Sequence, residues 1–144
     1  MKKIEFFQNI GPGYLHRYRL FPAITWKGIK RYFPANVFLH RFFRSDHDRC
    51  LHDHPWPSIS ILLRGELWEV YESEYGLGEL TRKIPRFKPI YRPAIWRHRI
   101  ILRSDDAWTL FVVGRKQRLW GFWPKGKFVT WREYLGVDGH ETVD

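Results

Sequence analysis

Cysteine is almost absent from this chain of 144 residues, which contains only Cys50. A single thiol cannot form an internal disulfide, so no covalent cross-link within the chain stabilises the fold. Chains without disulfides are typical of a reducing compartment, and we therefore expect a cytoplasmic protein. Long apolar runs are missing too, because no stretch approaches 18 uninterrupted apolar residues. We expect no membrane-spanning helix and no membrane partner.

Aromatic side chains, by contrast, are abundant. They make up 18% of the sequence, with eight Trp and eleven Phe, whereas disordered chains are poor in such residues. The length suits one domain with one hydrophobic core. We therefore expect residues 1–144 to form a single folded domain.

Positive charge exceeds negative charge, and the formal net charge is +10. The basic residues concentrate in 82–103 and 115–127, where they could neutralise phosphates and bind nucleic acid in a salt-dependent way. They could equally form a solvated surface that keeps an aromatic-rich domain soluble, or face a pocket and bind a small anion. No recognition helix, zinc finger or RNA-recognition signature accompanies the charge, so a nucleic-acid partner stays open but is not favoured.

Strand patterns dominate the chain, and helix patterns are scarce. We expect a tight hairpin at Arg64-Gly65-Glu66, a capped helix over 130–136 that begins with Thr130 and Glu133, and a weaker helix over 25–31. Short strands separated by Gly, Pro and Asp turns predict an all-β sandwich or barrel. The expected strands are 36–44, 58–63, 67–72, 80–84, 95–102, 108–113 and 117–122, with any strand between Pro85 and Pro93 short or at an edge.

Three histidines carry the strongest functional signal. His52 and His54 alternate on an extended segment, so their side chains point to the same side, and His98 lies in a second strand-like stretch. Three neutral imidazoles can hold a divalent transition metal and leave positions open for water or substrate. The alternative is that they are surface histidines with a chance spacing.

The segment His52-x-His54-x3-Ser58-x6-Gly65 resembles the first signature of the cupin superfamily, in which a glutamate usually stands at the position of Ser58. Residues 93–100 resemble the core of the second signature, which carries a proline and the final histidine. The resemblance implies an all-β, single-domain jelly-roll barrel with one or two short helices, and a metal held by His52, His54 and His98. Residues 40–56, with 108–111, 120–122 and 131–134, are further similar to a small cupin group from phages and bacteria.

Two departures from the cupin pattern bear on the chemistry. Ser58 is a poor metal ligand that could instead bond a metal-bound water or a substrate, and Trp96 and Arg97 replace the usual glycine before His98. Without the glutamate of the usual cupin site, the three histidines are all neutral ligands, and the site is more positive by one charge than the usual one. This charge favours an anionic substrate. Similar three-histidine centres of the superfamily use Fe(II) in dioxygenases. The resemblance therefore favours Fe(II), with Zn, Mn or Ni as alternatives.

Other residues complete the candidate site. Arg41 could anchor a carboxylate or phosphate, or form an outward salt bridge, since it and His40 face opposite sides of one strand. Trp108 could form an aromatic wall of the barrel interior, and His47 could supply a fourth ligand if its loop folds over the barrel mouth. Asp53 faces away from the metal and could contact a ligand, pair with an arginine or be exposed.

The leading functional hypothesis is a metal-binding cupin protein. If the protein is an enzyme, we expect an Fe(II)-type dioxygenase that acts on a small anionic substrate. The alternatives are a metal-dependent isomerase, epimerase or hydrolase, a non-catalytic domain that binds a small ligand, and a nucleic-acid-binding barrel. Apolar strands at the edges of the sheets could pair with a second copy of the chain, so a homodimer is a further alternative.

Overall fold

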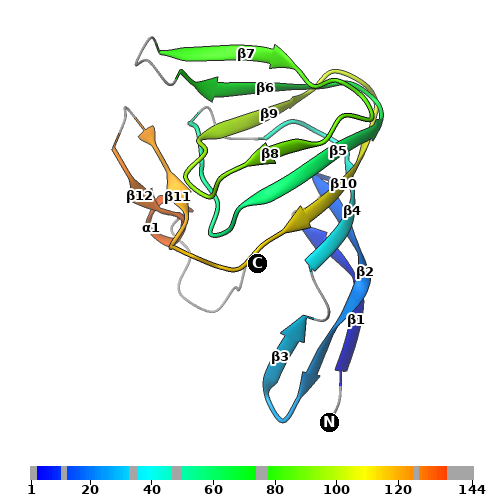
Figure 1. The fold of residues 1–144 in the computed structure, drawn as a ribbon. Coiled ribbons are helices and arrows are strands. Elements are labelled where there is room, and N and C mark those ends of the chain that lie inside the picture. Colours follow the sequence, from blue (N-terminus) through cyan, green and yellow to red (C-terminus); the bar gives the residue numbers. More distant parts are fainter. Residues whose placement is uncertain are drawn as a thin grey trace.

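The computed structural model describes residues 3–10, 13–32, 36–46, 50–73, 78–124 and 127–135. Within these ranges the chain is built almost entirely of strands (Figure 1). In chain order the elements are β1 (Lys3–Ile10), β2 (Leu15–Trp26), β3 (Ile29–Tyr32), β4 (Asn36–Phe42), β5 (Ser58–Arg64), β6 (Leu67–Glu72), β7 (Glu79–Lys83), β8 (Ile90–Arg92), β9 (His98–Leu102), β10 (Ala107–Val113), β11 (Gly121–Phe122), β12 (Val129–Thr130) and α1 (Trp131–Leu135).

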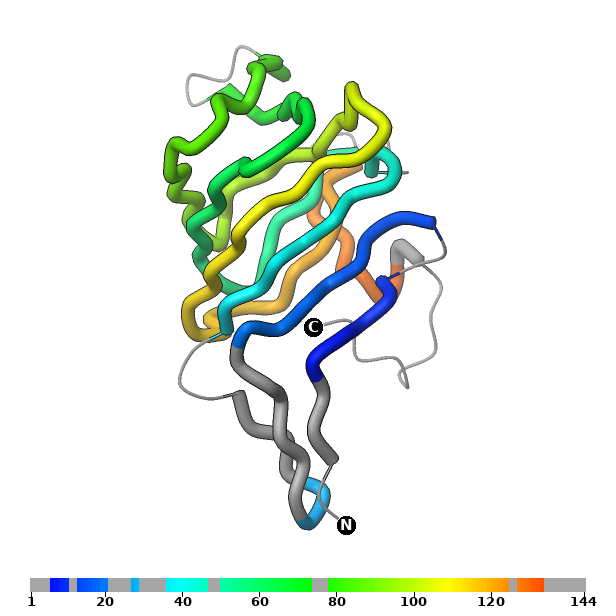
Figure 2. Tube along the Cα trace, turned by 90° about the vertical axis from the view of Figure 1, so that its right-hand side faces the viewer, coloured from blue at the N-terminus to red at the C-terminus, as the bar shows by residue number. Residues whose placement is uncertain are grey.

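The strands form two main sheets and one small ribbon. The larger sheet has the order β1-β2-β4-β10-β5-β8, with β3 attached to β2; the smaller sheet has the order β7-β6-β9, and β11 pairs with β12. Figure 2 shows β2, β4, β10 and β5 of the larger sheet running side by side. All named pairs are antiparallel. The predicted all-β class with little helix is confirmed.

The expected strands from 36 to 84 and over 108–113 correspond to β4 to β7 and β10, and β8 is the short edge strand expected among the prolines. The expected strand 95–102 is strand from His98 (β9), and of the expected strand 117–122 only Gly121–Phe122 (β11) is strand. The expected helix over 25–31 is wrong, because those residues form the hairpin of β2 and β3. Lys27 and Gly28 at its tip both have positive φ, 50° and 76°. Two successive residues with positive φ make the turn whose twist suits a β-hairpin, and no helix can continue through it.

Gly65 occupies the turn that the sequence predicts, but the turn is not a hairpin. β5 pairs with β10 and β8, whereas β6 pairs with β7 and β9, so the turn leads the chain from the larger to the smaller sheet. Gly65 has φ +90°, and a Cβ there would lie 2.7 Å from the Cα of Ala107. Only glycine fits this crossing.

The hydrophobic core fills one end of the space between the two sheets. Its buried centre is Leu62, Leu67, Ile84 and Ala107, against which Phe42, Ile90, Ile100 and Leu102 pack. The predicted cap of the C-terminal helix is confirmed, since Glu133 N donates to Thr130 Oγ1 at 3.4 Å. Among the described residues no helix is long and apolar enough to cross a membrane.

Candidate metal centre

Backbone pairing brings the three predicted histidines together. His52 N donates to His98 O and His98 N donates to His52 O, each at 2.9 Å, so the two residues form one antiparallel pair. Paired residues on antiparallel strands direct their side chains to the same face. His54 stands two residues further on, and its backbone N donates to Ala94 O at 3.1 Å. Alternation then returns the His54 side chain to the face that carries His52 and His98.

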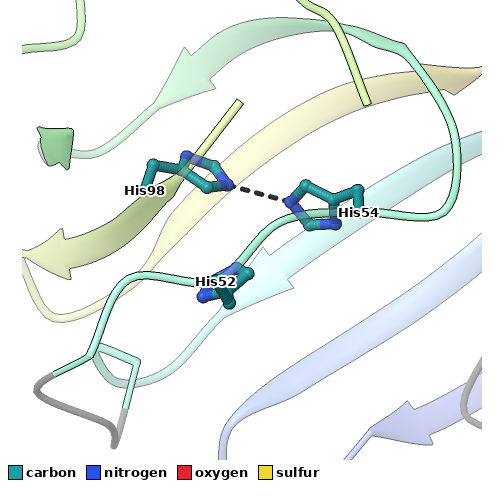
Figure 3. A group of neighbouring side chains, drawn as sticks. All are labelled: His52, His54 and His98. Atoms are coloured by element: carbon teal, nitrogen blue, oxygen red, sulfur yellow. Dashed lines mark hydrogen bonds between the residues drawn. The ribbon is translucent and has the colours of Figure 1, made fainter. Parts of the chain in front are cut away.

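The imidazoles converge on one small volume (Figure 3). One ring nitrogen from each residue lies within 4.8 Å of those of the other two, and Nε2 of His54 is 2.9 Å from Nε2 of His98. Two nitrogen ligands of a tetrahedral ion lie about 3.3 Å apart when each bond is about 2.0–2.1 Å. The separation of the His54 and His98 nitrogens is close to this value, and the three rings form a group that could hold one metal ion.

A buried carboxylate orients His98. Glu69, on β6, has no exposed surface, and its Oε1 accepts hydrogen bonds from His98 Nδ1 and Arg92 Nε, both at 2.7 Å. Arg82 donates to Oε2 through Nε at 2.7 Å and Nη2 at 2.6 Å. Burial alone would raise the pKa of Glu69, but the hydrogen bonds from His98 and Arg92 and the charge of Arg92 hold it well below its usual range. Glu69 is thus an ionised, fully bonded acceptor.

The contact with Glu69 determines which nitrogen of His98 can bind a metal. A carboxylate can only accept, so Nδ1 carries the hydrogen and Nε2 keeps a lone pair directed toward His54. Burial lowers the pKa of His98 to about 4, although the Glu69 hydrogen bond opposes the shift. Burial, followed by the charges of His52, His98, Arg92 and Arg17, lowers the pKa of His54 well below its usual value. Both rings are neutral at pH 7, which metal ligation requires.

The histidines border a cavity of about 180 Å³ between the sheets. Asp46 also lies on its wall: its Oδ2 accepts from Ile100 N at 2.6 Å and is 4.0 Å from His52 Nδ1, and its Oδ1 accepts from the Tyr14 hydroxyl. Most of the remaining wall is apolar, including Leu15, Phe42, Trp56, Leu62, Phe111 and Trp120. The polar groups on the wall are Tyr14, Arg17, His40, Asp46, Ser60, Arg92 and Thr109.

Three residues expected to bind substrate do not line this cavity. Arg41 and Trp108 face each other across β4 and β10 on the outer face, where Arg41 Nη2 pairs with Asp106 at 2.9 Å. The inner face carries their chain neighbours His40 and Thr109. The Arg41 alternative that the structure selects is the outward salt bridge.

Ser58 is buried and shares the inner face of β5 with Ser60, but it pairs with Val113 at the strand end, beyond the residues that line the cavity. Ser60 is the serine of this strand that reaches the cavity wall.

Asp53, between the two ligand candidates, faces away from them and is fully buried. Its carboxylate accepts from Gly121 N at 2.8 Å and Trp123 Nε1 at 2.9 Å, and forms an ion pair with Arg118. Asp53 thus ties the histidine segment to β11. His47 lies outside the described residues.

Glu69 is the main functional residue that sequence reasoning missed. The alternation in 67–72 predicts a solvated face for the acidic residues, which is correct for exposed Glu72 and wrong for Glu69. Glu69 stands two residues after the buried Leu67 and so lies on the same face of the strand. That spacing was the signal in the sequence that could have placed Glu69 inside. The inward position of Arg17 carried no local signal, because β1 to β3 were not expected.

No protein-family model and no curated protein sequence matches the chain. Solved structures do match it in fold. Fe(II)-HppE with the alternative substrate (S)-1-HPP superimposes with a TM-score of 0.52 at 11% identity, over 78% of this chain and 56% of that one. KdgF from Halomonas sp. gives 0.51 at 17% identity, over 76% of this chain and 87% of that one.

Oxalate oxidase in complex with the substrate analogue glycolate gives a TM-score of 0.53 at 15% identity, over 78% of this chain and 56% of that one. The chain thus spans little more than half the length of HppE and of oxalate oxidase. At these identities the likeness concerns the fold, and the fold is that of the cupins.

Proposed function

We propose that this protein binds a divalent transition metal, Fe(II) in the first place, through His52, His54 and His98, and acts on a small anionic molecule as a dioxygenase. One observation carries the proposal: three imidazoles converge on a cavity, and a buried carboxylate orients one of them. Metal-binding histidines commonly donate their second ring N–H to a carboxylate, and the pair of His98 and Glu69 has this arrangement. The occurrence of Fe(II) in HppE, a protein of similar fold, supports the choice of metal.

A bound Fe(II) would supply redox chemistry and coordination positions for reactants. The residues of the chain supply the surroundings. Glu69 holds a proton on His98 Nδ1 and fixes the orientation of that ring, and most of the wall beside the centre is apolar. The guanidinium group of Arg17 stands on the cavity wall, whereas the charge of Arg92 is balanced by Glu69. A guanidinium beside the cavity favours an anionic substrate over a neutral one.

Metal analysis tests the proposal. The purified protein is loaded with Fe(II) without oxygen, desalted and analysed for metal, beside His98→Gln and the matched control His16→Gln. His16 lies on the outer face of β2 against the Phe7 and Phe43 rings. We expect about one equivalent in the wild type and in the control, and a loss of at least tenfold in His98→Gln. A wild type that retains no stoichiometric transition metal, with Zn, Mn and Ni also tried, would overturn the proposal.

Turnover is a separate measurement. Oxygen uptake by the Fe(II)-loaded protein is followed with a panel of short carboxylates and phosphonates. We expect uptake that depends on one panel member and disappears in His98→Gln. Binding of a panel member without uptake would instead support a non-catalytic domain that binds a small ligand.

A further inference from the structure

Two buried polar side chains lie together on the inner face of the larger sheet. His40 on β4 pairs in register with Thr109 on β10, and residues paired across antiparallel strands direct their side chains to the same face. Both line the cavity that the three-histidine centre borders, and they are only 4% and 6% exposed. On the same wall their neighbours Phe42 and Phe111 are apolar. The two residues thus form a polar spot that opens to the cavity and not to the solvent.

The contact with Arg17 determines which nitrogen of His40 carries the hydrogen. Arg17 Nε donates to His40 Nε2 at 3.0 Å, and a guanidinium group can only donate, so Nε2 keeps a lone pair. Burial, with the charges of Arg17 and Arg19, lowers the pKa of His40 well below its usual value, and the ring is neutral. The single hydrogen of a neutral imidazole is then on Nδ1. This assignment depends on one hydrogen bond and not on the charge around Arg17.

Neither polar atom of the pair is satisfied within the described part of the chain. There, no group accepts a hydrogen bond from His40 Nδ1, and no group bonds to the hydroxyl of Thr109. Buried polar groups are normally hydrogen-bonded, because an unpaired one destabilises the fold. A valine at position 109 would have nearly the same shape as the threonine and no such cost. The pair therefore suits a ligand in the cavity better than it suits the fold.

Other polar groups on the cavity wall already have partners in the protein. The Tyr14 hydroxyl donates to Asp46, and Asp46 also accepts from the backbone of Ile100. Ser60 accepts from Arg92 Nη1 at 2.6 Å, and Arg92 Nε donates to Glu69 at 2.7 Å. These contacts hold the scaffold together, whereas the hydrogen-bonding capacity of His40 Nδ1 and Thr109 is left for a ligand.

We propose that His40 and Thr109 bind the carboxylate of the substrate, with the Nδ1–H of His40 and the hydroxyl of Thr109 as the two donors. The atom that meets His40 must be an acceptor, because Nδ1–H can only donate. Two adjacent donors match the two oxygens of one carboxylate group. The other end of the substrate is assigned to the metal, so this inference rests on the proposed function.

The size of the cavity limits that substrate. The volume is about 180 Å³, and an apolar cavity of about 150 Å³ in a protein holds one benzene molecule. A ligand of roughly six to eight non-hydrogen atoms therefore fits. The substrate class is that of short carboxylic acids with an oxygen or sulfur atom that can reach the metal.

The test compares the wild type with Thr109→Val, and Thr81→Val on the exposed face of β7 is the matched control. Butanoate and benzene are titrated by NMR into the metal-free proteins. We expect Thr109→Val to weaken butanoate binding about 10- to 100-fold, because one hydrogen bond to a charged group is lost. Benzene binding should not fall, and Thr81→Val should bind both probes as the wild type does. Thr109→Val should fold as stably as the wild type, because no hydrogen bond of the described chain is removed.

Equal affinity of butanoate for the wild type and Thr109→Val would overturn the inference, and so would a wild type that shows no saturable binding of butanoate. The ¹⁵N shifts of the His40 ring give a second measurement that needs no variant. We expect a protonated Nδ1 and a bare Nε2, and the reverse tautomer would contradict the assigned donor. Failure of the proposed function is distinguishable, because it appears as absent metal binding, whereas both measurements use the metal-free protein.

Discussion

The inner and outer faces of the larger sheet each carry a histidine and an arginine, in different surroundings. Each face has one histidine, one arginine and one further side chain in the same three strands, in adjacent positions. On the inner face the row is buried and lines the cavity, and on the outer face the corresponding row is partly exposed. The inner row is Arg17, His40 and Thr109, and the outer row is His16, Arg41 and Trp108.

The histidine and the arginine of the two rows differ in their surroundings. The inner histidine accepts a hydrogen bond from a buried guanidinium and has a lowered pKa. The outer arginine pairs with Asp106 while its side chain is 38% exposed, a type of ion pair that contributes little to stability. A single step along a strand therefore decides whether an arginine can meet a ligand in the cavity.

The smaller sheet offers the same comparison and the largest expected effect. Glu69 is buried and bonded to His98, Arg82 and Arg92, whereas Glu72 pairs with Arg97 at the surface. We expect Glu69→Gln to lower the free energy of unfolding by about 3–5 kcal/mol, because it leaves buried guanidinium charge without its carboxylate. It should also weaken metal binding about 10- to 100-fold.

Glu72→Gln is the matched control for Glu69→Gln. Its side chain is 44% exposed, so we expect a loss of less than about 1 kcal/mol and no change in metal affinity. Urea unfolding and metal titration of both variants provide the measurements. Equal losses of stability and of metal affinity in Glu69→Gln and Glu72→Gln would contradict the different roles assigned to the buried and the exposed carboxylate.

Acid should destabilise the metal-free protein through the buried histidines. The pKa of His98 is about 4 in the folded protein against 6.5 ordinarily, so between these values the unfolded chain binds a proton that the folded chain does not. Its contribution to stability is present above pH 6.5 and is lost as the pH falls to 4, by about 3 kcal/mol. The lowered pKa of Glu69 acts in the same direction below pH 4.5.

Urea unfolding of the metal-free protein at pH 7, 5.5 and 4 measures this loss. His98→Gln, which removes the titrating ring, should show a smaller dependence on pH. Unfolding free energies that stay constant from pH 7 to pH 4 would show that these rings are not buried as neutral groups.

A smaller effect is expected at Asp53, which joins the histidine segment to β11. Asp53→Asn replaces one acceptor oxygen with an NH₂ group that faces the donors Arg118 and Trp123. We expect a loss of about 2 kcal/mol in thermal or urea unfolding. Exposed Asp105 provides the control, and Asp105→Asn should stay within about 0.5 kcal/mol of the wild type. If the Asp53→Asn variant is as stable as the wild type, β11 is not held by this carboxylate.

The smallest effect is expected at the outer row. Arg41→Gln removes the partly exposed pair with Asp106, and we expect a loss of about 0.2–1 kcal/mol. Urea unfolding measures it beside Arg17→Gln. A loss larger for Arg41→Gln than for Arg17→Gln would reverse the assignment of the two faces.

The sequence predicts β4 to β7, β9 and β10 because they alternate or carry strong turn signals such as Gly65, whereas β11 is only the end of the expected strand 117–122 and β12 was not expected. It also brings His52, His54 and His98 into one site, because alternation and the cupin resemblance agree on their side chains. Local sequence patterns gave wrong predictions where the structure depends on which distant segments pair with each other. The hairpin of β2 and β3 depends on a turn at Lys27 and Gly28, and the sheet change at Gly65 depends on which strands pair later in the chain.

The choice between faces was likewise not available from the sequence. Alternation shows that His40 and Arg41 point to opposite sides, but either could have been inside. The partner strands decide, since β2 and β10 present Arg17 and Thr109 on the face of His40. The role of Glu69 could not be predicted because its arginine partners lie 13 and 23 positions further along the chain.

X-ray absorption at the metal edge of the Fe(II)-loaded protein examines the coordination of the ion itself. Three imidazole nitrogens at about 2.0–2.2 Å, with the outer scattering of three histidine rings, are expected. The signal of one ring should disappear in His98→Gln and persist in His16→Gln. An ion surrounded by oxygen atoms alone, with no imidazole scattering, would contradict the three-histidine centre.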